Sequence, residues 1–311
     1  MILMDTFMVI RRCYARMDFL KNEKGVPTGM EFGTLRIAES LQKKYPGQEI
    51  VFCLDSKKSW RKEKYPFYKA DREKKQRENF KGSDEQYKET QSAYYKRLGI
   101  FLRFLREAYV TAEAVCFEAD DIMHALSRPD ESRPWYPDEH HYIYTNDHDL
   151  HQSVSDNVTV LRSFKSIIYT WDMRKVEMTY GVPPKYLAEF FAFVGDKVDN
   201  IPGVPRIRRS FLAKLINWCH DRGLAQGQML REIASAEWPP VMKEDVKHHI
   251  YSDQWSKNYD LIKLHEQLPQ LKIGQPSDSE FVREKLQEWS IYSLNISKRL
   301  GVQRDLSEEE F

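Results

Sequence analysis

Short apolar segments that end in an acidic residue recur along this chain, and they constrain its fold more than any other feature. Three such segments, with the acids that follow them, are residues 1–4 before Asp5, residues 50–54 before Asp55, and residues 142–145 before Asp147 and Asp149. A continuous apolar run of this length is typical of a strand buried on both faces of a parallel sheet. Helical spacing of apolar residues lies between these runs, over residues 30–44, 98–108 and 118–126. We therefore expect an α/β fold with a central, mainly parallel sheet flanked by helices.

The acids at these positions predict a metal site. Ligands of open parallel sheets bind outside the carboxyl ends of the strands, so acids from separate strand ends can meet there. Further acids stand near the ends of expected helices: Glu118, Asp120, Asp121, Asp196 and Asp199. So many carboxylates repel one another unless cations neutralise them, and oxygen ligands suit Mg²⁺ or Mn²⁺. Two such ions are the usual apparatus for phosphodiester hydrolysis. The alternative for each single aspartate is a helix cap or a solvated turn.

A basic segment follows Asp55. Residues 57–81 contain 11 Lys and Arg against four acids, whereas the whole chain has a net charge of only +1. Trp60, Tyr65, Phe67 and Tyr68 are interleaved with these charges. Positive charge combined with aromatic faces favours single-stranded nucleic acid, although a solvated charged helix is the alternative. The candidate nucleic-acid contacts in this segment are Arg61, Lys62, Lys64, Tyr68, Lys69, Arg72, Lys74 and Lys75.

The remaining sequence suggests a second, helical part. We expect no strand after about residue 180, and we place the nuclease-like sheet domain at 1–180 and a helical region at 181–311. The 311 residues include four dispersed cysteines and no apolar run of about 18 residues, so we expect a soluble cytoplasmic protein without disulfides or membrane contacts. Residues 130–139, rich in Pro and charge, are expected to form a surface loop, and the acidic end at 308–311 is expected to fray.

Five segments, in order and near the expected spacing, resemble the phage and bacterial 5′-nuclease and flap-endonuclease family, whose catalytic domain is PIN-like (resolvase-like). They are Leu3-Met4-Asp5, Asp55 with residues 60–72, Glu118-Ala119-Asp120-Asp121, residues 145–150 (Thr-Asn-Asp-His-Asp-Leu) and residues 195–205 (Gly-Asp-Lys-Val-Asp-Asn-Ile-Pro-Gly-Val-Pro). Together with their surroundings they span about residues 1–216. The resemblance implies a helical arch at about 56–97 and a helix–three-turn–helix element at about 195–220 that holds duplex DNA.

The resemblance also implies a role for each matching residue. Asp5, Asp55, Glu118 and Asp120 would hold a first Mg²⁺ ion, with Asp121 close by. Asp147, Asp149 and Asp196 would hold a second ion, with Asp199 as an outer contributor. Lys69 and Arg72 would bind the scissile phosphate at the base of the arch, and Mn²⁺ would substitute for Mg²⁺.

The sequence departs from the family pattern at two places. Thr6 stands where the family usually has Gly, and Arg206-Ile207-Arg208 replaces the usual Gly-Ile-Gly of the DNA-binding hairpin. Those glycines let amides approach phosphate closely and permit a bound K⁺, so both features are in question for this chain. Arg206, Arg208 and Arg209 either contact phosphate directly or face solvent. A divergent hairpin is also a feature of the phage ribonuclease H branch.

We therefore predict a metal-dependent, structure-dependent 5′-nuclease of DNA replication or repair, acting 5′ to 3′ as a monomer. Its substrate would be DNA with a 5′ flap, tail or free end, or RNA annealed to DNA, and its products would carry a 5′ phosphate. One alternative is a non-catalytic DNA-junction binder, against which the full set of acids argues. The other is a PIN-type ribonuclease, and such proteins are usually much shorter. His148 is expected to be at most an outer contact of the metal site.

Overall fold

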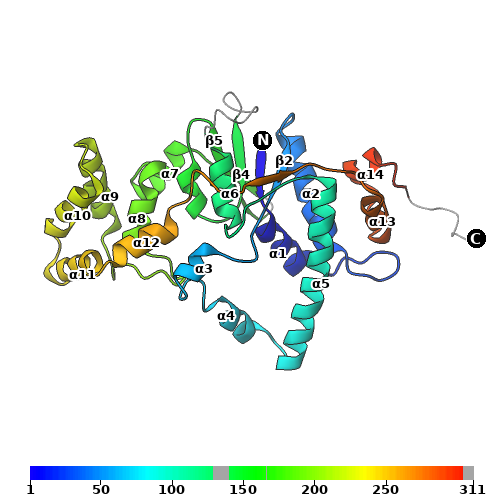
Figure 1. The fold of residues 1–311 in the computed structure, drawn as a ribbon, viewed down its shortest axis with the longest axis horizontal. Coiled ribbons are helices and arrows are strands. Elements are labelled where there is room, and N and C mark those ends of the chain that lie inside the picture. The colour runs from blue at the N-terminus through cyan, green and yellow to red at the C-terminus, as the bar shows by residue number, and fades with distance from the viewer. Residues whose placement is uncertain (129–139, 166, 304–311) are drawn as a thin grey trace, which may run out of the picture. The chain divides into compact units, whose positions relative to one another are not determined.

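The computed structural model describes residues 1–128, 140–165 and 167–303, drawn as a ribbon in Figure 1. These residues form two compact units. Of the described residues, the first unit contains those within Met1–Ser56, Lys81–Met123 and from Pro269 onward, and the second contains those within Lys57–Phe80 and His124–Leu268. The predicted domain boundary near residue 180 falls inside the second unit and stays a prediction. The loop expected at 130–139 and the frayed end expected at 308–311 lie outside the described residues.

The first unit is built around strands that begin the chain. Its elements are β1 (Ile2–Asp5), α1 (Thr6–Met17), α2 (Gly29–Lys44), β2 (Ile50–Leu54), α5 (Asp84–Ala108), β3 (Val110–Glu113), the start of α6 (Ala119–Leu126), β7 (Lys272–Gly274), α13 (Glu280–Glu288) and α14 (Asn295–Arg299). Neighbouring strands lie in the order β1-β2-β3-β7. The pairs β1–β2 and β2–β3 are parallel, with Asp5 opposite Cys53, and β7 is antiparallel to β3. Because every residue of β2 is buried, the prediction of a doubly covered parallel strand is confirmed.

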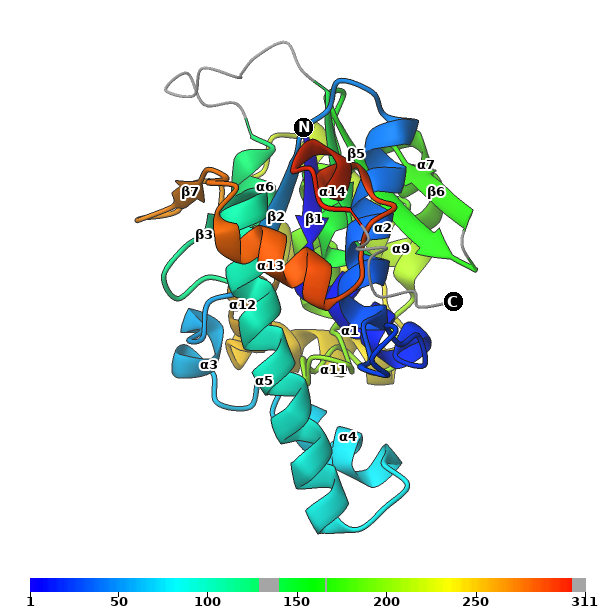
Figure 2. The ribbon, with the colours of Figure 1, turned by 90° about the vertical axis from the view of Figure 1, so that its right-hand side faces the viewer.

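Helix α5 is longer than its apolar stripe suggests. The apolar stripe predicted a helix over residues 98–108, where Phe101, Phe104 and Leu105 are fully buried, and the residues before it were expected to belong to the arch. The helix begins at Asp84 because Ser83 and Gln86 form a capping box that satisfies the first amides. Phe101 and Phe104 both contact the ring of Trp289, at 5.8 and 5.0 Å between centroids, so α5 packs against the end of α13 (Figure 2).

The second unit joins three strands to a group of helices. Its elements are α3 (Trp60–Lys64), α4 (Arg72–Asn79), β4 (His141–Tyr144), the 3₁₀ helix η1 (Asp149–Ser153), β5 (Val158–Phe164), β6 (Ile167–Trp171), α7 (Met173–Tyr180), the 3₁₀ helix η2 (Pro184–Tyr186), α8 (Leu187–Val194), α9 (Arg209–Asp221), α10 (Gln226–Ser235), α11 (Pro240–Tyr251) and α12 (Gln254–Ile262). Strand β5 pairs in parallel with β4 and antiparallel with β6. Helix α8 packs on α12, where Phe193 contacts Trp255 at 5.8 Å.

The strand pairings confirm the predicted fold class, since three of the five described above are parallel and the exceptions involve β6 and β7. The expectation of no strand after residue 180 is wrong, because β7 forms at Lys272–Gly274. It escaped notice because a three-residue strand with one apolar side chain has no periodicity to detect. No helix in the described parts of the chain has both the length and the apolar character needed to cross a membrane.

Candidate metal and phosphate site

The first unit brings acids to the carboxyl ends of its parallel strands. Asp5 ends β1, and its carboxylate accepts a hydrogen bond of 3.0 Å from the Met8 amide, which caps α1. Asp55 follows β2, and its Oδ1 accepts a hydrogen bond of 2.7 Å from the amide of Ala119, the first residue of α6. Helix capping therefore accounts for one oxygen of each acid. A carboxylate has about four lone-pair sites, so the same groups retain the chemistry of metal ligands.

The buried thiol of Cys53 lies close enough to several of these acids to feel their charge. Burial raises the pKa of Cys53 well above its usual range, and the negative charges of Asp5, Asp120 and Asp55 raise it further. Negative charge from the end of β1, from the residue after β2 and from the start of α6 therefore acts on the same buried thiol. Asp121 is fully buried one residue farther along α6, about 100° around the helix from Asp120. Glu118 precedes α6 and is half-buried. Metal binding by this set stays a prediction.

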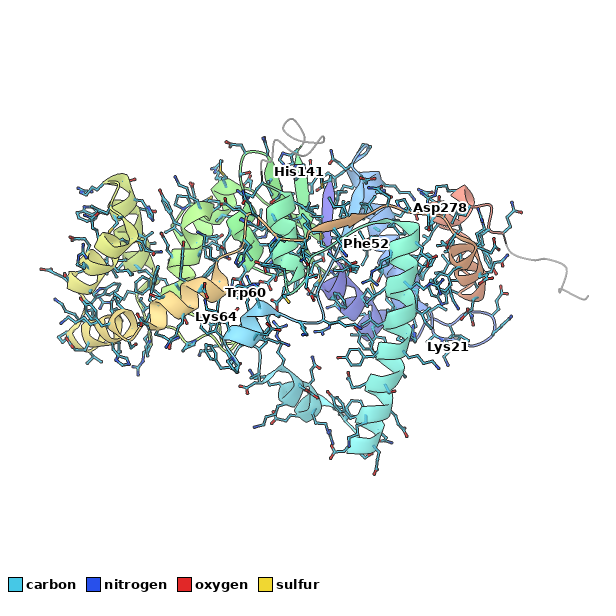
Figure 3. All side chains as sticks on the ribbon, viewed as in Figure 1. Lys21, Phe52, Trp60, Lys64, His141 and Asp278 are labelled. Atoms are coloured by element: carbon cyan, nitrogen blue, oxygen red, sulfur yellow. The ribbon has the colours of Figure 1, made fainter. Side chains whose placement is uncertain are left out.

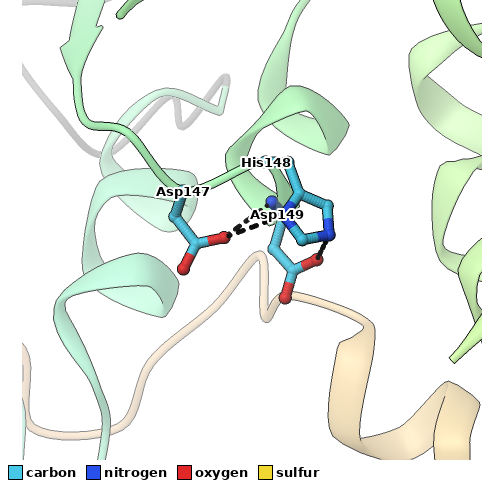
Figure 4. A group of neighbouring side chains, drawn as sticks. All are labelled: Asp147, His148 and Asp149. Atoms are coloured by element: carbon cyan, nitrogen blue, oxygen red, sulfur yellow. Dashed lines mark hydrogen bonds and ion pairs between the residues drawn. The ribbon is translucent and has the colours of Figure 1, made fainter. Parts of the chain in front are cut away.

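The second unit assembles a tighter group at the end of β4. The ligand atoms of Asp147, His148 and Asp149 all lie within 4.8 Å of one another (Figure 4). The turn that presents them is fixed by two hydrogen bonds: the Asp147 amide donates to the Thr145 hydroxyl at 3.0 Å, and the Asp149 amide donates to Asp147 Oδ1 at 2.9 Å. From the loop after α8, Asp196 places an oxygen 3.8 Å from the Nε2 atom of His148. One imidazole is therefore surrounded by three carboxylates.

The electrostatics of this group fit a cation. Burial raises the pKa of Asp149 well above its usual range, and the neighbouring carboxylates of Asp147, Asp199 and Asp196 raise it further, while Lys69 opposes them. A divalent ion would remove this repulsion. Carboxylate oxygens suit Mg²⁺ and Mn²⁺, and the imidazole nitrogen adds a donor that suits transition metals better than Mg²⁺. The donor set of the second unit thus fits a divalent metal.

Asp199 makes contacts of a different kind. Its Oδ1 lies 2.5 Å from Arg72 Nη2, and its Oδ2 lies 3.6 Å from the Lys69 ammonium. Its carbonyl oxygen accepts a hydrogen bond of 3.1 Å from the Lys69 amide. Asp199 is only 5% exposed. The structure therefore brings the predicted phosphate-binding pair, Lys69 and Arg72, together on one carboxylate.

Two of the predicted nucleic-acid contacts are buried. Arg61 is 2% exposed, and its guanidinium donates to the carbonyl oxygens of Leu261 at 2.7 Å and Lys263 at 3.5 Å. Tyr68 is 5% exposed, with the Lys69 ammonium 4.6 Å from its ring centroid. Arg61 fastens α3 to the end of α12, and Tyr68 packs inside the unit. We therefore correct both expectations: neither side chain presents a surface to nucleic acid, because a charge and aromatic count along the sequence does not reveal which members face inward.

The other basic residues of the segment lie at the surface. Lys64 of α3, labelled in Figure 3, is exposed. It forms an ion pair of 2.7 Å with Asp260 of α12. Lys62, Lys74 and Lys75 are also exposed. Their predicted contact with nucleic acid stays a prediction.

The hairpin between α8 and α9 depends on close backbone approach. Gly195 has a φ of +71°, and a Cβ on Gly203 would lie 1.9 Å from the Val194 carbonyl oxygen. Arg206 keeps a left-handed φ of +51° although it is not glycine. This arginine is exposed, as are Arg208 and Arg209 at the start of α9. Three positive side chains therefore stand near a helix N-terminus, where contact with phosphate stays a prediction, as does any bound K⁺.

Two histidines near the acids have surroundings that the sequence did not predict. His148 lies among the carboxylates, which its position between Asp147 and Asp149 could have indicated. His151 is fully buried, stacked 4.1 Å from Trp171 with its Nδ1 atom 2.9 Å from the Tyr180 hydroxyl. Nothing in the local sequence distinguishes it from a surface histidine.

Acids gathered at the carboxyl ends of parallel strands, with a lysine and an arginine beside one group, define a phosphodiester-cleaving nuclease of the α/β class. Residues 1–181 match the family model described as the 5′-3′ exonuclease, N-terminal resolvase-like domain, so the chain belongs to the 5′-3′ exonuclease family and is a 5′-nuclease. A 5′-3′ exonuclease of Aquifex aeolicus is 29% identical over 311 residues, covering 94% of this chain and 92% of that protein. The thermostable DNA polymerase I of Thermus filiformis is 34% identical over 203 residues, which are 64% of this chain and 22% of the polymerase.

Solved structures show the same fold. The T5 D15 protein co-crystallised with metal ions superposes with a TM-score of 0.64 at 18% identity, covering 84% of this chain and 88% of that one. Flap endonuclease-1 from Methanococcus jannaschii gives a TM-score of 0.53 at 14% identity over 96% of this chain and 89% of that one. At these identities the likeness concerns the fold alone.

Proposed function

We propose that this chain cuts DNA at or near a single-stranded 5′ end, recognising the structure of the substrate, and that it uses two divalent metal ions, Mg²⁺ or in its place Mn²⁺. The observation that carries the proposal is the gathering of Asp147, Asp149 and Asp196 around His148, in the same unit as the Lys69–Arg72 pair. Metal ions and DNA are also named for a T5 D15 flap endonuclease complex among the structural neighbours.

Two sets of acids would hold the two metal ions. Asp5, Asp55, Glu118 and Asp120 would hold one ion, and Asp147, Asp149 and Asp196 would hold the other, with His148 as a further donor. Bound divalent ions supply a water of lowered pKa and positive charge for the attacking and leaving oxygens. The chain's part is to hold the carboxylates in place through the capping and turn hydrogen bonds described above.

The basic pair would bind the phosphate itself. A guanidinium and an ammonium form charge-assisted hydrogen bonds with phosphate oxygens, and Arg72 can do so in a bidentate manner. Both groups would stabilise the additional negative charge that develops on the phosphate during cleavage. The Lys69 ammonium would already be positioned for phosphate before substrate binds, since it contacts the Tyr68 ring and Asp199.

Exposed basic residues would hold the rest of the substrate. Lys62, Lys74 and Lys75 would contact the single strand, and the arginines at 206, 208 and 209 would contact duplex phosphates without a need for K⁺. Each phosphate contact releases counterions, so affinity should fall steeply with salt. We propose further that RNA annealed to DNA is accepted, and that the enzyme works as a monomer in the cytoplasm, where such substrates arise.

The test is cleavage of a duplex that carries a 5′ single-stranded tail and a label at the 3′ end of the tailed strand. Wild type should cut near the junction in Mg²⁺ or Mn²⁺ and not in EDTA, and the Asp147→Asn, Asp149→Asn double variant should bind without cutting. The same tail made of RNA, and a free RNA strand, complete the substrate set. Binding without cleavage in either metal would refute the metal-dependent mechanism, and faster cleavage of free RNA than of the tailed duplex would favour a PIN-type ribonuclease.

A further inference from the structure

Asp196 and Asp199 lie three residues apart in one loop, and the negative charges of both raise the pKa of Asp149. Their closest side-chain contacts nevertheless differ. Asp196 accepts a hydrogen bond of 2.7 Å from the Val198 amide and faces His148 in the acidic group. Asp199 makes its ion pairs with Lys69 and Arg72. The loop holds this arrangement because Asp196 and Ile201 pair through two backbone hydrogen bonds of 2.9 and 2.7 Å, which closes the loop on itself.

The segment that carries Lys69 and Arg72 leads into a short helix that its own residues do not bury. Helix α4 begins at Arg72, has eight residues, and every one of them is exposed or half-buried. An isolated helix of this length is marginal in water, because the cost of starting a helix exceeds the gain from so few hydrogen bonds. Lys69 itself has a left-handed φ of +57°, a conformation that persists only where the surroundings impose it.

Asp199 provides that constraint on both sides of the turn. Its carbonyl oxygen binds the Lys69 amide, and its carboxylate binds the side chain of Arg72, the first residue of α4. The carboxylate is nearly buried, with 7% of the side chain exposed, so solvent screens these ion pairs less than it screens surface pairs. A guanidinium has five N–H donors, so binding to Asp199 does not exhaust the hydrogen bonds that Arg72 can form.

We propose that Asp199 is a positioning residue for the phosphate-binding pair and not a ligand of the metal. It orders Lys69, Arg72 and the start of α4 before substrate binds, so that the phosphate meets groups already in place. The consequence for cleavage rests on the proposed function, whereas the ordering of the segment is a property of the protein alone.

The first experiment needs neither metal nor DNA. Endoproteinase Glu-C cuts after Glu73 and Glu78 of α4, and these sites are unchanged in Asp199→Asn, in Asp196→Asn and in Arg72→Gln. If Asp199 holds the segment, Asp199→Asn and Arg72→Gln should each speed cleavage there by about tenfold through local opening, and the double variant should be no faster than either. The matched control, Asp196→Asn, should stay within about twofold of wild type. Unchanged cleavage in both Asp199→Asn and Arg72→Gln would overturn the proposal.

The second experiment separates positioning from metal binding. Mn²⁺ affinity, measured by calorimetry, should fall by about tenfold or more in Asp196→Asn and by less than about threefold in Asp199→Asn. In single-turnover cleavage of the tailed duplex, Asp199→Asn should slow the reaction as much as Arg72→Gln does, and the double variant should be no slower. A loss of Mn²⁺ affinity in Asp199→Asn equal to that in Asp196→Asn would make Asp199 a metal ligand and refute the inference.

The two proposals fail separately. If no form of the protein cuts DNA while Asp199→Asn still exposes α4 to the protease, the proposed function fails and the ordering role stands. If wild type cuts DNA and the variants at 199 and 72 leave α4 protected, the ordering role fails. Should Asp199→Asn not fold, as circular dichroism would show, Arg72→Gln with Arg72→Lys as its conservative partner carries the protease test alone.

Discussion

The buried imidazole of His151 should make the protein lose stability on mild acidification. Burial lowers the pKa of His151 from 6.5 to about 3, and the positive charges of Arg162 and His148 add to this effect. Below pH 6.5 His151 is therefore protonated in the unfolded chain but stays neutral in the folded chain. Its contribution to the free energy of unfolding is present near neutral pH and is lost as the pH falls toward 3. Between pH 6.5 and pH 5 this loss amounts to ~2 kcal/mol, at ~1.4 kcal/mol per pH unit.

Urea unfolding in EDTA, at about pH 7.5 and about pH 5, measures this loss. His151→Gln removes the titrating group and keeps a side chain that can hydrogen-bond to the Tyr180 hydroxyl. The free energy of unfolding of wild type should fall between the two pH values by ~2 kcal/mol more than that of His151→Gln. His248→Gln, which replaces an exposed histidine in the same way, should behave as wild type. Equal losses in wild type and His151→Gln would refute the reasoning, since the pH dependence would then come from other groups.

Three further substitutions test the packing and the metal site. Gly203→Ala places a Cβ 1.9 Å from a backbone carbonyl oxygen and should lower the free energy of unfolding by ~3 kcal/mol or more. The control Gly227→Ala meets nothing within 4 Å and should raise the free energy of unfolding by up to ~1 kcal/mol. An unchanged free energy of unfolding in Gly203→Ala would contradict the hairpin geometry. Arg61→Met removes the hydrogen bonds to two carbonyl oxygens and should lower the free energy of unfolding by ~2–3 kcal/mol. The salt dependence of DNA binding should stay unchanged. A weaker salt dependence in this variant would show that Arg61 binds phosphate after all. His148→Asn removes an imidazole from the acidic group and should weaken Mn²⁺ binding more than Mg²⁺ binding in calorimetry, so equal changes for the two ions would exclude His148 as a ligand.

The sequence predicted several of the parallel strands and the acids at their ends because both are visible in a few consecutive residues. An apolar run such as residues 50–54 indicates a strand buried on both faces, and the acidic residue Asp55 directly after it indicates where the strand ends. Helix α2 was predicted at residues 30–44 and is found at Gly29–Lys44, since its apolar spacing matches the helical period. The strands β3, β5 and β7 were missed because polar residues interrupt their apolar residues. Strand β6, Ile-Ile-Tyr-Thr-Trp followed by Asp172, was also missed, although it has the same pattern as residues 142–145.

The sequence by itself therefore determined the class of fold and the chemistry, through residue types whose spacing is local. Only the tertiary structure decided the direction in which each side chain points. Arg61 and Lys62 are neighbours with the same charge, yet one is buried on backbone carbonyl oxygens and the other lies at the surface. Asp196 and Asp199 match the same motif, yet one faces an imidazole and the other faces a lysine and an arginine that precede it by more than a hundred residues. Burial and charge pairing depend on contacts between distant segments, and a local pattern carries no record of them.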